Sequence, residues 1–302
     1  MPELPEVETV ARGLRAVLPG RRILGVRLGK TDFVDDPAAL EEQLPGTTVS
    51  GIRRFGKFLV VDLQRDIHKA EELSLLIHLG MTGQIIVCPP EAPIPAHTHV
   101  FIALDDGREL RYTDVRRFGR MAMLSNGAHE RVLGGLGAEP LEVSEADFCQ
   151  RIQSRSAHIK ALLLNQSVLR GIGNIYADES LWRAKIHPKK LGSKLSDDEI
   201  RRLHRAVQSV LTEAIRMRGS SISDYVDSAG EKGEYQSRHR VYQRHSKKCF
   251  RCRTPIRRMI VAGRSSHFCP RCQPAPRQRA AKSVPRRETR KSGSRHKKRK
   301  SS

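Results

Sequence analysis

The sequence of 302 residues predicts an α+β fold with several domains: an N-terminal helix on a β-sandwich, an all-helical domain, a small metal-binding ribbon and a disordered basic tail. Three observations lead to this prediction. Short β-type runs dominate as far as about residue 125, helical patterns replace them from about residue 144, and two CxxC pairs follow. We expect the domain boundaries at residues 2–130, 131–235, 236–274 and 275–302.

The first predicted element is a helix over residues 5–18, which begins with Pro5 and is ended by Gly20. One face of this helix is apolar because four residues recur at helical spacing: Val7, Val10, Leu14 and Val17. The β-type runs that follow are RILGVRL, TVSGIRRFG, KFLVVDL, LSLLIHLGMTGQIIV and HVFIALDDGRELRY, and Asp106–Gly107 marks a hairpin in the last. Strands at this density favour a β-sandwich or a barrel, with the first helix against it.

Helical patterns dominate the second domain. Ser144 suits the start of a helix that reaches about Ser154, and the segments SAHIKALLLNQ and NIYADESLWRAK are also helical in pattern. Ser196 and Glu199 form a capping box ahead of a long apolar periodicity that ends at Gly219. Residues 219–234 are rich in glycine, serine and charge, which indicates a mobile loop.

The charge of the chain indicates a polyanionic partner. The formal net charge is +22 and the isoelectric point about 10.3, and nucleic acid is the commonest partner of so basic a protein. The segment Met1–Thr9 has acids and prolines where a signal peptide needs basic and apolar regions. No apolar run approaches the roughly 20 residues that span a bilayer. We therefore expect a soluble, intracellular protein.

Four of the six cysteines predict one structural zinc ion. The pairs Cys249/Cys252 and Cys269/Cys272 are sixteen residues apart, which is typical of a four-thiolate zinc ribbon. A redox pair is the alternative, and two matched pairs without a thioredoxin-like context argue against it. Because four thiolates fill a tetrahedral zinc site, no position is left for a catalytic water.

The opening MPELPEVET is the most informative stretch of the sequence. Removal of Met1 would leave Pro2 with a free secondary amine, which is a nucleophile. The alternative is an extended lead-in whose acids suit a helix N-terminus. That alternative accounts for Glu6 and Glu8, but it does not account for the Pro2–Glu3 start ahead of any helix.

Several motifs then stand in order along the chain: PELPEVET, GKFL, IHLGMTG, RYTDVRRFG, GIGNIYADESL and CFRC…AGRSSHFCPRC. Together they make the chain resemble the formamidopyrimidine-DNA glycosylase family, in its bacterial form with a zinc finger. The resemblance covers nearly everything from Pro2 to Gln273 and leaves the tail outside. It implies a β-sandwich with an N-terminal helix, a helix–two-turns–helix domain and a zinc finger. It also implies double-stranded DNA in the cleft between the first two domains, with the damaged nucleotide flipped out of the stack. We accordingly expect a monomer in the cytoplasm, associated with the nucleoid through DNA.

The resemblance implies a bifunctional DNA glycosylase and AP lyase of base excision repair that removes oxidised purines, namely 8-oxoguanine and formamidopyrimidines. One alternative is the sister branch of the fold that removes oxidised pyrimidines. The PELPEVET start and the zinc-finger form favour the purine branch. The other alternative is a non-catalytic zinc-ribbon protein that binds distorted DNA. The Pro2–Glu3 start argues against this alternative, because a protein that only binds DNA needs neither residue.

The resemblance also implies the catalytic residues. Pro2 attacks C1′ of the damaged nucleotide and forms a Schiff base, and Glu3 acts as the general acid on the opening sugar. Lys57 transfers a proton in β-elimination and contacts phosphate. Arg264, which the ribbon spacing puts near a hairpin tip, binds phosphate and donates a proton in δ-elimination. Glu6 is either a supporting carboxylate or only a helix-start acid.

Further residues are implied in DNA binding. A wedge of three side chains fills the space left by the flipped base, with Arg116 facing the orphaned base: Met81, Arg116 and Phe118. By residue type alone, Met81 and Phe118 would be core residues. Contacts to the DNA backbone are implied for His78, His97, Arg155 and Asn174, and less strongly for Lys160 and Tyr242. Asn174 can also cap a helix. A second metal site at His97 and His99 is not expected, because further ligands are lacking.

The basic tail lies outside the resemblance, and we predict that residues 275–302 tether the enzyme to DNA without regard to sequence. They hold twelve Lys/Arg against the single acid Glu288. Such binding depends on counterion release, with a slope of roughly −0.9 in log K against log salt per neutralised phosphate. Truncation at Gln273 should therefore weaken binding to undamaged DNA at low salt and flatten this slope. Single-turnover excision at saturating enzyme should hardly change. An unchanged slope would favour the alternative, an inert or RNA-contacting extension.

Overall fold

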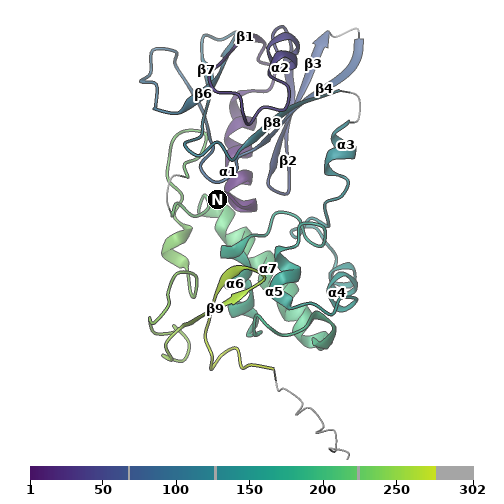
Figure 1. Ribbon diagram of the computed structural model, residues 1–302, viewed down its shortest axis with the longest axis vertical. Helices are drawn as coiled ribbons and strands as arrows, with labels where there is room; N and C mark the ends of the chain where they lie inside the picture. Colours follow the sequence, from purple (N-terminus) through teal and green to yellow (C-terminus); the bar gives the residue numbers. More distant parts are fainter. Residues whose placement is uncertain (67–68, 126–127, 223–224, 277–302) are drawn as a thin grey trace, which may run out of the picture.

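A computed structural model describes residues 1–66, 69–125, 128–222 and 225–276, without the side chains of residues 66, 69–72 and 129–130. Figure 1 shows a β-rich upper half and a helical lower half, with the N-terminus near their junction. The predicted tail lies outside the described residues from Arg277 onward. The α+β architecture is as predicted.

The first helix, α1 (Leu4–Val17), runs upward from the junction into the β-rich half (Figure 1). Its apolar face is buried, as the spacing predicts, fully at Val7, Val10 and Leu14 and partly at Val17. Glu3 precedes the helix as its cap. The Glu3 amide donates to Glu6 Oε2 at 2.8 Å, which completes a capping box.

Two antiparallel four-stranded sheets enclose the upper core. One has the order β1-β6-β7-β5 and the other the order β2-β3-β4-β8. Residues 79–83 connect β4 in one sheet to β5 in the other, so the long run LSLLIHLGMTGQIIV is divided at this turn. The strands are β1 (Ile23–Leu28), β2 (Thr48–Phe55), β3 (Phe58–Asp66), β4 (Lys69–His78), β5 (Gln84–Cys88), β6 (Thr98–Leu104), β7 (Glu109–Thr113) and β8 (Arg120–Ser125), with the short helix α2 (Pro37–Gln43) after β1.

The lower half is helical. Its helices are α3 (Ala128–Leu133), α4 (Glu145–Gln153), α5 (Ile159–Leu164), α6 (Asn174–Ala184) and α7 (Asp197–Arg216), with the 3₁₀ turns Gly192–Lys194 and Tyr235–Arg238. The predicted caps are present, since Ser144 accepts from the Asp147 amide and Ser196 forms the capping box with Glu199. None of the helices that the structure describes is long and apolar enough to cross a membrane.

The segment that follows α7 packs back on α1. Gly219 turns the chain with φ +75°, and Tyr235 N donates to its carbonyl at 2.9 Å, which closes the segment at both ends. The buried Tyr225 hydroxyl donates to the Glu6 carbonyl at 3.2 Å. The mobility predicted for residues 219–234 stays a prediction, and residues 223–224 lie outside the described part.

The C-terminal module is a hairpin of β9 (Arg257–Val261) and β10 (Arg264–Phe268), which lies against α6 in Figure 1. A buried ion pair helps to dock it. Lys160 Nζ donates to Asp178 Oδ1 and to the Ser265 carbonyl, each at 2.7 Å, and the His267 amide donates to Asp178 Oδ2 at 2.8 Å. The residue after Arg264 is therefore held directly by the helical half.

Candidate active site and nucleic-acid interface

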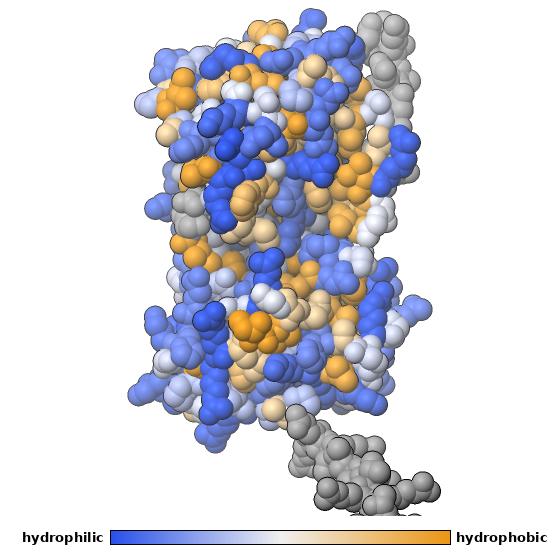
Figure 2. All heavy atoms as spheres, in the orientation of Figure 1, coloured by the Kyte–Doolittle hydropathy of each residue, from blue (hydrophilic) through white to orange (hydrophobic). Residues whose placement is uncertain are grey.

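A cavity of about 610 Å³ lies where the two halves meet. The surface in Figure 2 is hollowed between its upper and lower parts. Both halves and the ribbon contribute to the lining: Met1, Glu3, Lys57, Met81, Ala161, Leu164, Asn165, Gln166, Gly173, Asn174, Ile175, Ile222, Tyr242, Ala262 and Arg264. Three of the four predicted catalytic residues thus share one cavity. The fourth, Pro2, is buried between Met1 and Glu3.

The Glu3 carboxylate is placed on the amino end of α6. It accepts from the Ile175 amide at 3.0 Å and from the Tyr176 amide at 3.4 Å, where the helix dipole favours negative charge. A Cβ on Gly173 would lie 2.3 Å from Glu3 Cδ, so only glycine allows this approach. Burial raises the pKa of the Glu3 carboxyl to about 7, against the lowering effect of Lys57 and the two amides. The group can therefore exchange a proton near neutral pH.

Glu6 ties three segments together beneath Glu3. Its Oε1 accepts from the Tyr176 hydroxyl and from the Ser220 amide at 2.7 Å, while Oε2 accepts from the Glu3 amide. Burial raises the pKa of the Glu6 carboxyl, although these donors oppose the shift. Glu6 thus completes the capping box through the Glu3 amide, and its role as a supporting carboxylate of the site stays a prediction.

Lys57 and Arg264 approach the cavity from opposite halves. Lys57 lies in the turn between β2 and β3, after Gly56 at φ +62°. Burial lowers the pKa of the Lys57 ammonium, as Arg264 also does, while Glu3 and Glu6 oppose the shift. Arg264 is exposed at the start of β10, next to the tip residues Ala262 and Gly263. An ammonium group with a lowered pKa and an exposed guanidinium are therefore both present at the cavity.

Lys160 is not available for the phosphate contact predicted for it. Its side chain is fully buried, and its ammonium binds Asp178 and the Ser265 carbonyl. That prediction is wrong because α6 supplies a carboxylate partner that sequence spacing does not reveal. Tyr242, the other weaker prediction, is partly buried and lines the cavity.

The three predicted wedge residues project from two adjacent loops. Met81 is 38% exposed and Phe118 is 58% exposed, so neither is a core residue. The Arg116 guanidinium carbon lies 4.5 Å from the centroid of the Phe118 ring. A Cβ on Gly80 would lie 2.4 Å from the Phe118 carbonyl carbon, which shows how closely the loops approach.

A buried carboxylate that sequence reasoning missed, Asp114, holds these two loops together. Its Oδ1 accepts from the Thr82 hydroxyl at 2.5 Å, and its Oδ2 accepts from the Gly119 amide at 2.9 Å and the Tyr112 hydroxyl at 3.1 Å. The only signal in the sequence is its place inside RYTDVRRFG. Ile222 was missed as well, and it lines the cavity from the segment after α7.

The four residues predicted to contact the DNA backbone have different environments. His97 and Arg155 are exposed. His78 is partly buried beside Phe58 and accepts from the Gly80 amide at 3.1 Å, and burial lowers the pKa of its ring. Asn174 lines the cavity and its buried Oδ1 has no hydrogen-bond partner. Its predicted role as a helix cap is wrong, because Gly173 holds the cap position and Glu3 accepts from the first-turn amides.

The four paired cysteines fit one structural zinc ion. Their sulfurs all lie within 4.8 Å of one another, and no other such group of histidine, cysteine or acidic ligands occurs among the described residues. Cys249 and Cys269 are buried against Val241, Ile256 and Trp182. Convergence of both pairs on one point is what tetrahedral zinc requires and what a redox pair does not.

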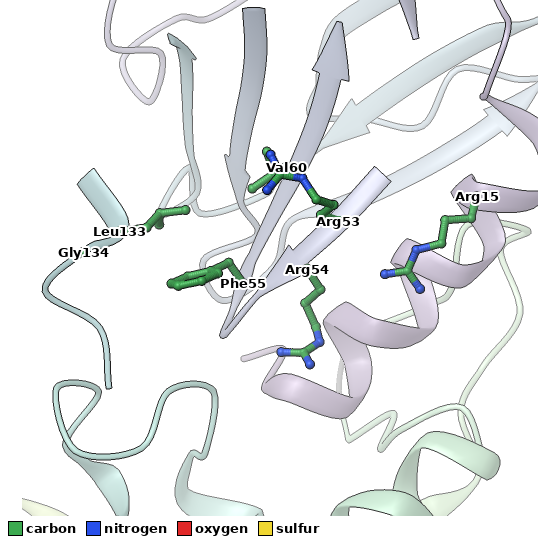
Figure 3. A pocket seen from close by; sticks show the side chains of 7 residues that line it. All are labelled: Arg15, Arg53, Arg54, Phe55, Val60, Leu133 and Gly134. Carbon is green, nitrogen blue, oxygen red and sulfur yellow. The ribbon is translucent and has the colours of Figure 1, made fainter. Parts of the chain in front are cut away.

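A larger cavity, of about 770 Å³, shares no lining residue with the first. Figure 3 shows Arg15 on α1 and Arg54 at the end of β2, with Phe55 and Leu133 nearby. Both guanidinium groups already bind the Glu8 carboxylate, at 3.0 and 2.9 Å. Arg15 and Arg54 are thus already paired with a carboxylate of the protein. Neither Glu3 nor Lys57 lines this cavity.

Comparison with known proteins agrees with this geometry. Three family models match: the formamidopyrimidine-DNA glycosylase N-terminal domain over residues 1–121, the H2TH domain of the same proteins over 136–226, and a zinc finger found in FPG and IleRS over 246–275. The formamidopyrimidine-DNA glycosylase of Solibacter usitatus is 47% identical over 275 residues, 90% of this chain and 99% of that protein. The one of Herpetosiphon aurantiacus is 43% identical, over 90% of this chain and its whole length.

Solved structures show the same fold. An FPG variant of Lactococcus lactis in complex with Fapy-dG DNA superposes with a TM-score of 0.83 at 35% identity, over 91% of this chain and 100% of that one. A complex of the Lactococcus enzyme with oxidised-pyrimidine DNA has a TM-score of 0.82 at 35% identity and the same coverage. The matches extend over the β-rich half, the helical half and the ribbon alike. The chain therefore belongs to the formamidopyrimidine-DNA glycosylase family, in its zinc-finger form.

Proposed function

We propose that this chain is a bifunctional glycosylase and AP lyase that removes oxidised purines, namely 8-oxoguanine and formamidopyrimidines, from double-stranded DNA in base excision repair. The observation that carries the proposal is the carboxyl group of Glu3. Its pKa of about 7 gives it a proton to donate beside Pro2, at a cavity that Lys57 and Arg264 also line. A protein that only binds DNA has no need for a buried, protonatable carboxyl at that place.

The proposed reaction begins after removal of Met1, when the Pro2 nitrogen attacks C1′ and the damaged base leaves. Glu3 donates its proton to the ring oxygen as the sugar opens, and the nitrogen–carbon bond becomes an iminium. An iminium formed from a secondary amine has no proton on its nitrogen, so it keeps its positive charge. This charge makes the C2′ proton more acidic. Lys57 then takes the C2′ proton while the C3′–O bond breaks and the 3′ phosphate leaves in β-elimination. Arg264 donates a proton to the 5′ phosphate, which leaves as the C5′–O bond breaks in δ-elimination. Water hydrolyses the iminium and frees Pro2.

The purine preference rests on the same features as the family assignment. The PELPEVET start and the zinc-finger form favour it. The oxidised-pyrimidine branch stays the second candidate, because the Lactococcus relative has been crystallised with a DNA of that kind. We further propose a cytoplasmic monomer, since one chain supplies the whole cavity lining. The domain boundaries at 130, 235 and 274 stay predictions.

The first prediction concerns Pro2. Borohydride reduction on an 8-oxoguanine duplex should trap the enzyme as a covalent adduct, and intact mass with peptide mapping should place the adduct on Pro2. Pro2→Gly should lose most of the trapping while binding of lesion DNA stays nearly unchanged, because the cavity lining is retained. An adduct mapped to a lysine in the wild-type protein would remove Pro2 from the mechanism.

The second prediction concerns the wedge. Met81→Ala and Phe118→Ala should each slow excision from duplex DNA by about tenfold, since base flipping costs a few kcal/mol and tenfold corresponds to about 1.4 kcal/mol. Thermal stability should change little, because both side chains are exposed. Leu24→Ala removes an apolar side chain about as exposed as Phe118, near the start of β1 and outside both wedge loops, and serves as the control. Variants that unfold easily yet excise normally would contradict the wedge.

The third prediction concerns the metal. Cys269→Ser should release zinc, loosen the hairpin that carries Arg264 and weaken DNA binding, because thiolate ligation contributes directly to folding of so small a module. Metal content by mass spectrometry and DNA affinity by fluorescence anisotropy measure the two effects. Cys149→Ser, outside the cluster, should change neither. Full activity of a metal-free protein would show that the ribbon folds without its ion.

A further inference from the structure

The ribbon and the segment before it carry positive charge without any acid. Between Gln236 and Pro276 the chain holds eleven Lys/Arg and no Asp or Glu. None of these cations forms an ion pair with a carboxylate elsewhere in the described part of the chain: Arg238, Arg240, Arg244, Lys247, Lys248, Arg251, Arg253, Arg257, Arg258, Arg264 and Arg271. Several arginines of the β-rich half are different, since Arg53, Arg54 and Arg120 all have carboxylate partners. So much positive charge without ion pairs favours contact with a polyanion along the whole ribbon and the segment before it, and not only at the hairpin tip that carries Arg264.

An aromatic ring stands within this charge. Phe250 is 52% exposed, although it lies in the turn between the zinc ligands Cys249 and Cys252. The guanidinium carbons of Arg240 and Arg244 lie 4.8 and 4.3 Å from its ring centroid. Two cations next to one exposed ring supply both a stacking surface and charges for a phosphate backbone.

The backbone that carries these side chains is firmly held. The amides of Arg240, Val241 and Tyr242 all donate to the buried Glu179 carboxylate, at 2.8–3.0 Å. The buried Arg244 Nε has no hydrogen-bond partner, and only its Nη2 donates, to the Lys248 carbonyl at 3.4 Å. The cluster is therefore preorganised while its hydrogen-bonding capacity is not used up.

This cluster is separate from the active-site cavity. Phe250, Arg240 and Arg244 line neither that cavity nor the neighbouring one of about 550 Å³ at Asn174, Tyr242 and Arg264. A paired base is covered by its neighbours in the duplex, whereas an unpaired base offers a face for stacking. An exposed ring with two arginines beside it thus fits a single strand better than a duplex.

We propose that Phe250, Arg240 and Arg244 form a second nucleic-acid site, which binds single-stranded nucleic acid by stacking one base on Phe250 and placing its phosphates on the two arginines. The site lies beyond the proposed glycosylase function and does not depend on it. Its expected effect is to hold the enzyme at DNA with unpaired segments. Stacking of one base changes affinity by about tenfold or more when the aromatic ring is removed.

The test uses the full-length zinc-loaded protein and a labelled oligothymidylate of about 15 nucleotides, with binding followed by anisotropy at high enough salt to screen nonspecific charge. Phe250→Ala and Phe250→Leu should both weaken binding by about tenfold, because leucine keeps the apolar volume but not the ring. Ile260→Ala, an exposed apolar residue on the same ribbon, is the matched control. Zinc content and melting temperature should be equal in all variants.

Two further arms separate stacking from charge and from catalysis. A polyphosphate of similar charge, which has no bases to stack and no sugar for the proposed lyase to attack, should bind wild type and Phe250→Leu alike, whereas Arg240→Gln/Arg244→Gln should weaken binding of both the polyphosphate and the oligothymidylate. Phe250→Trp should show fluorescence quenching by the oligothymidylate, against the background of the single natural and buried Trp182. Excision from a lesion duplex should stay unchanged in Phe250→Leu. Damage to the active site could then not be the cause of its weaker binding to the oligothymidylate. Wild-type affinity in Phe250→Leu, or a tryptophan that is not quenched, would overturn the proposal.

Discussion

The two halves depend on the contact between the Glu3 carboxylate and the amino end of α6. The first-turn amides of a helix have no partner within it, and a buried carboxylate is costly without donors. Ile175 and Tyr176 supply those donors, so each group satisfies the other. The Leu4 amide donates to the Gly171 carbonyl at 3.0 Å and extends the same contact. The start of the chain is thereby fixed at the mouth of the cavity, where the proposed chemistry needs it.

The same helix organises the rest of the site because its successive polar residues point in different directions. Tyr176 donates to Glu6, Asp178 binds Lys160 and the His267 amide, and Glu179 accepts from the amides of residues 240–242. Each is buried, so loss of one partner would leave a charge or donor without compensation. Stability and site geometry therefore rest on the same groups. This coupling explains how a short helix can position the first helix, the ribbon tip and the segment before the ribbon together.

Charge is distributed differently in the two halves. Around α1 and β2 the arginines share Glu8 and Glu139 and serve the fold. The ribbon has Lys and Arg residues but no Asp or Glu. Its stability comes from the four sulfurs and the apolar residues packed on them. A module that is held by metal and packing does not need its cations for internal ion pairs. Its whole positive potential is available to a polyanion.

The sequence by itself determined the elements whose signals are local: the apolar face of α1, the Ser196–Glu199 capping box, the β-type runs and the two cysteine pairs. Only the tertiary structure decided that Glu3 accepts from the first-turn amides of α6, that Lys160 is buried and that Asp114 joins the wedge loops. The physical reason is distance along the chain. Periodicity, caps and ligand spacing act within a few residues or one turn. Glu3 and Ile175 are 172 positions apart, and no local pattern specifies which buried carboxylate will meet which distant donor.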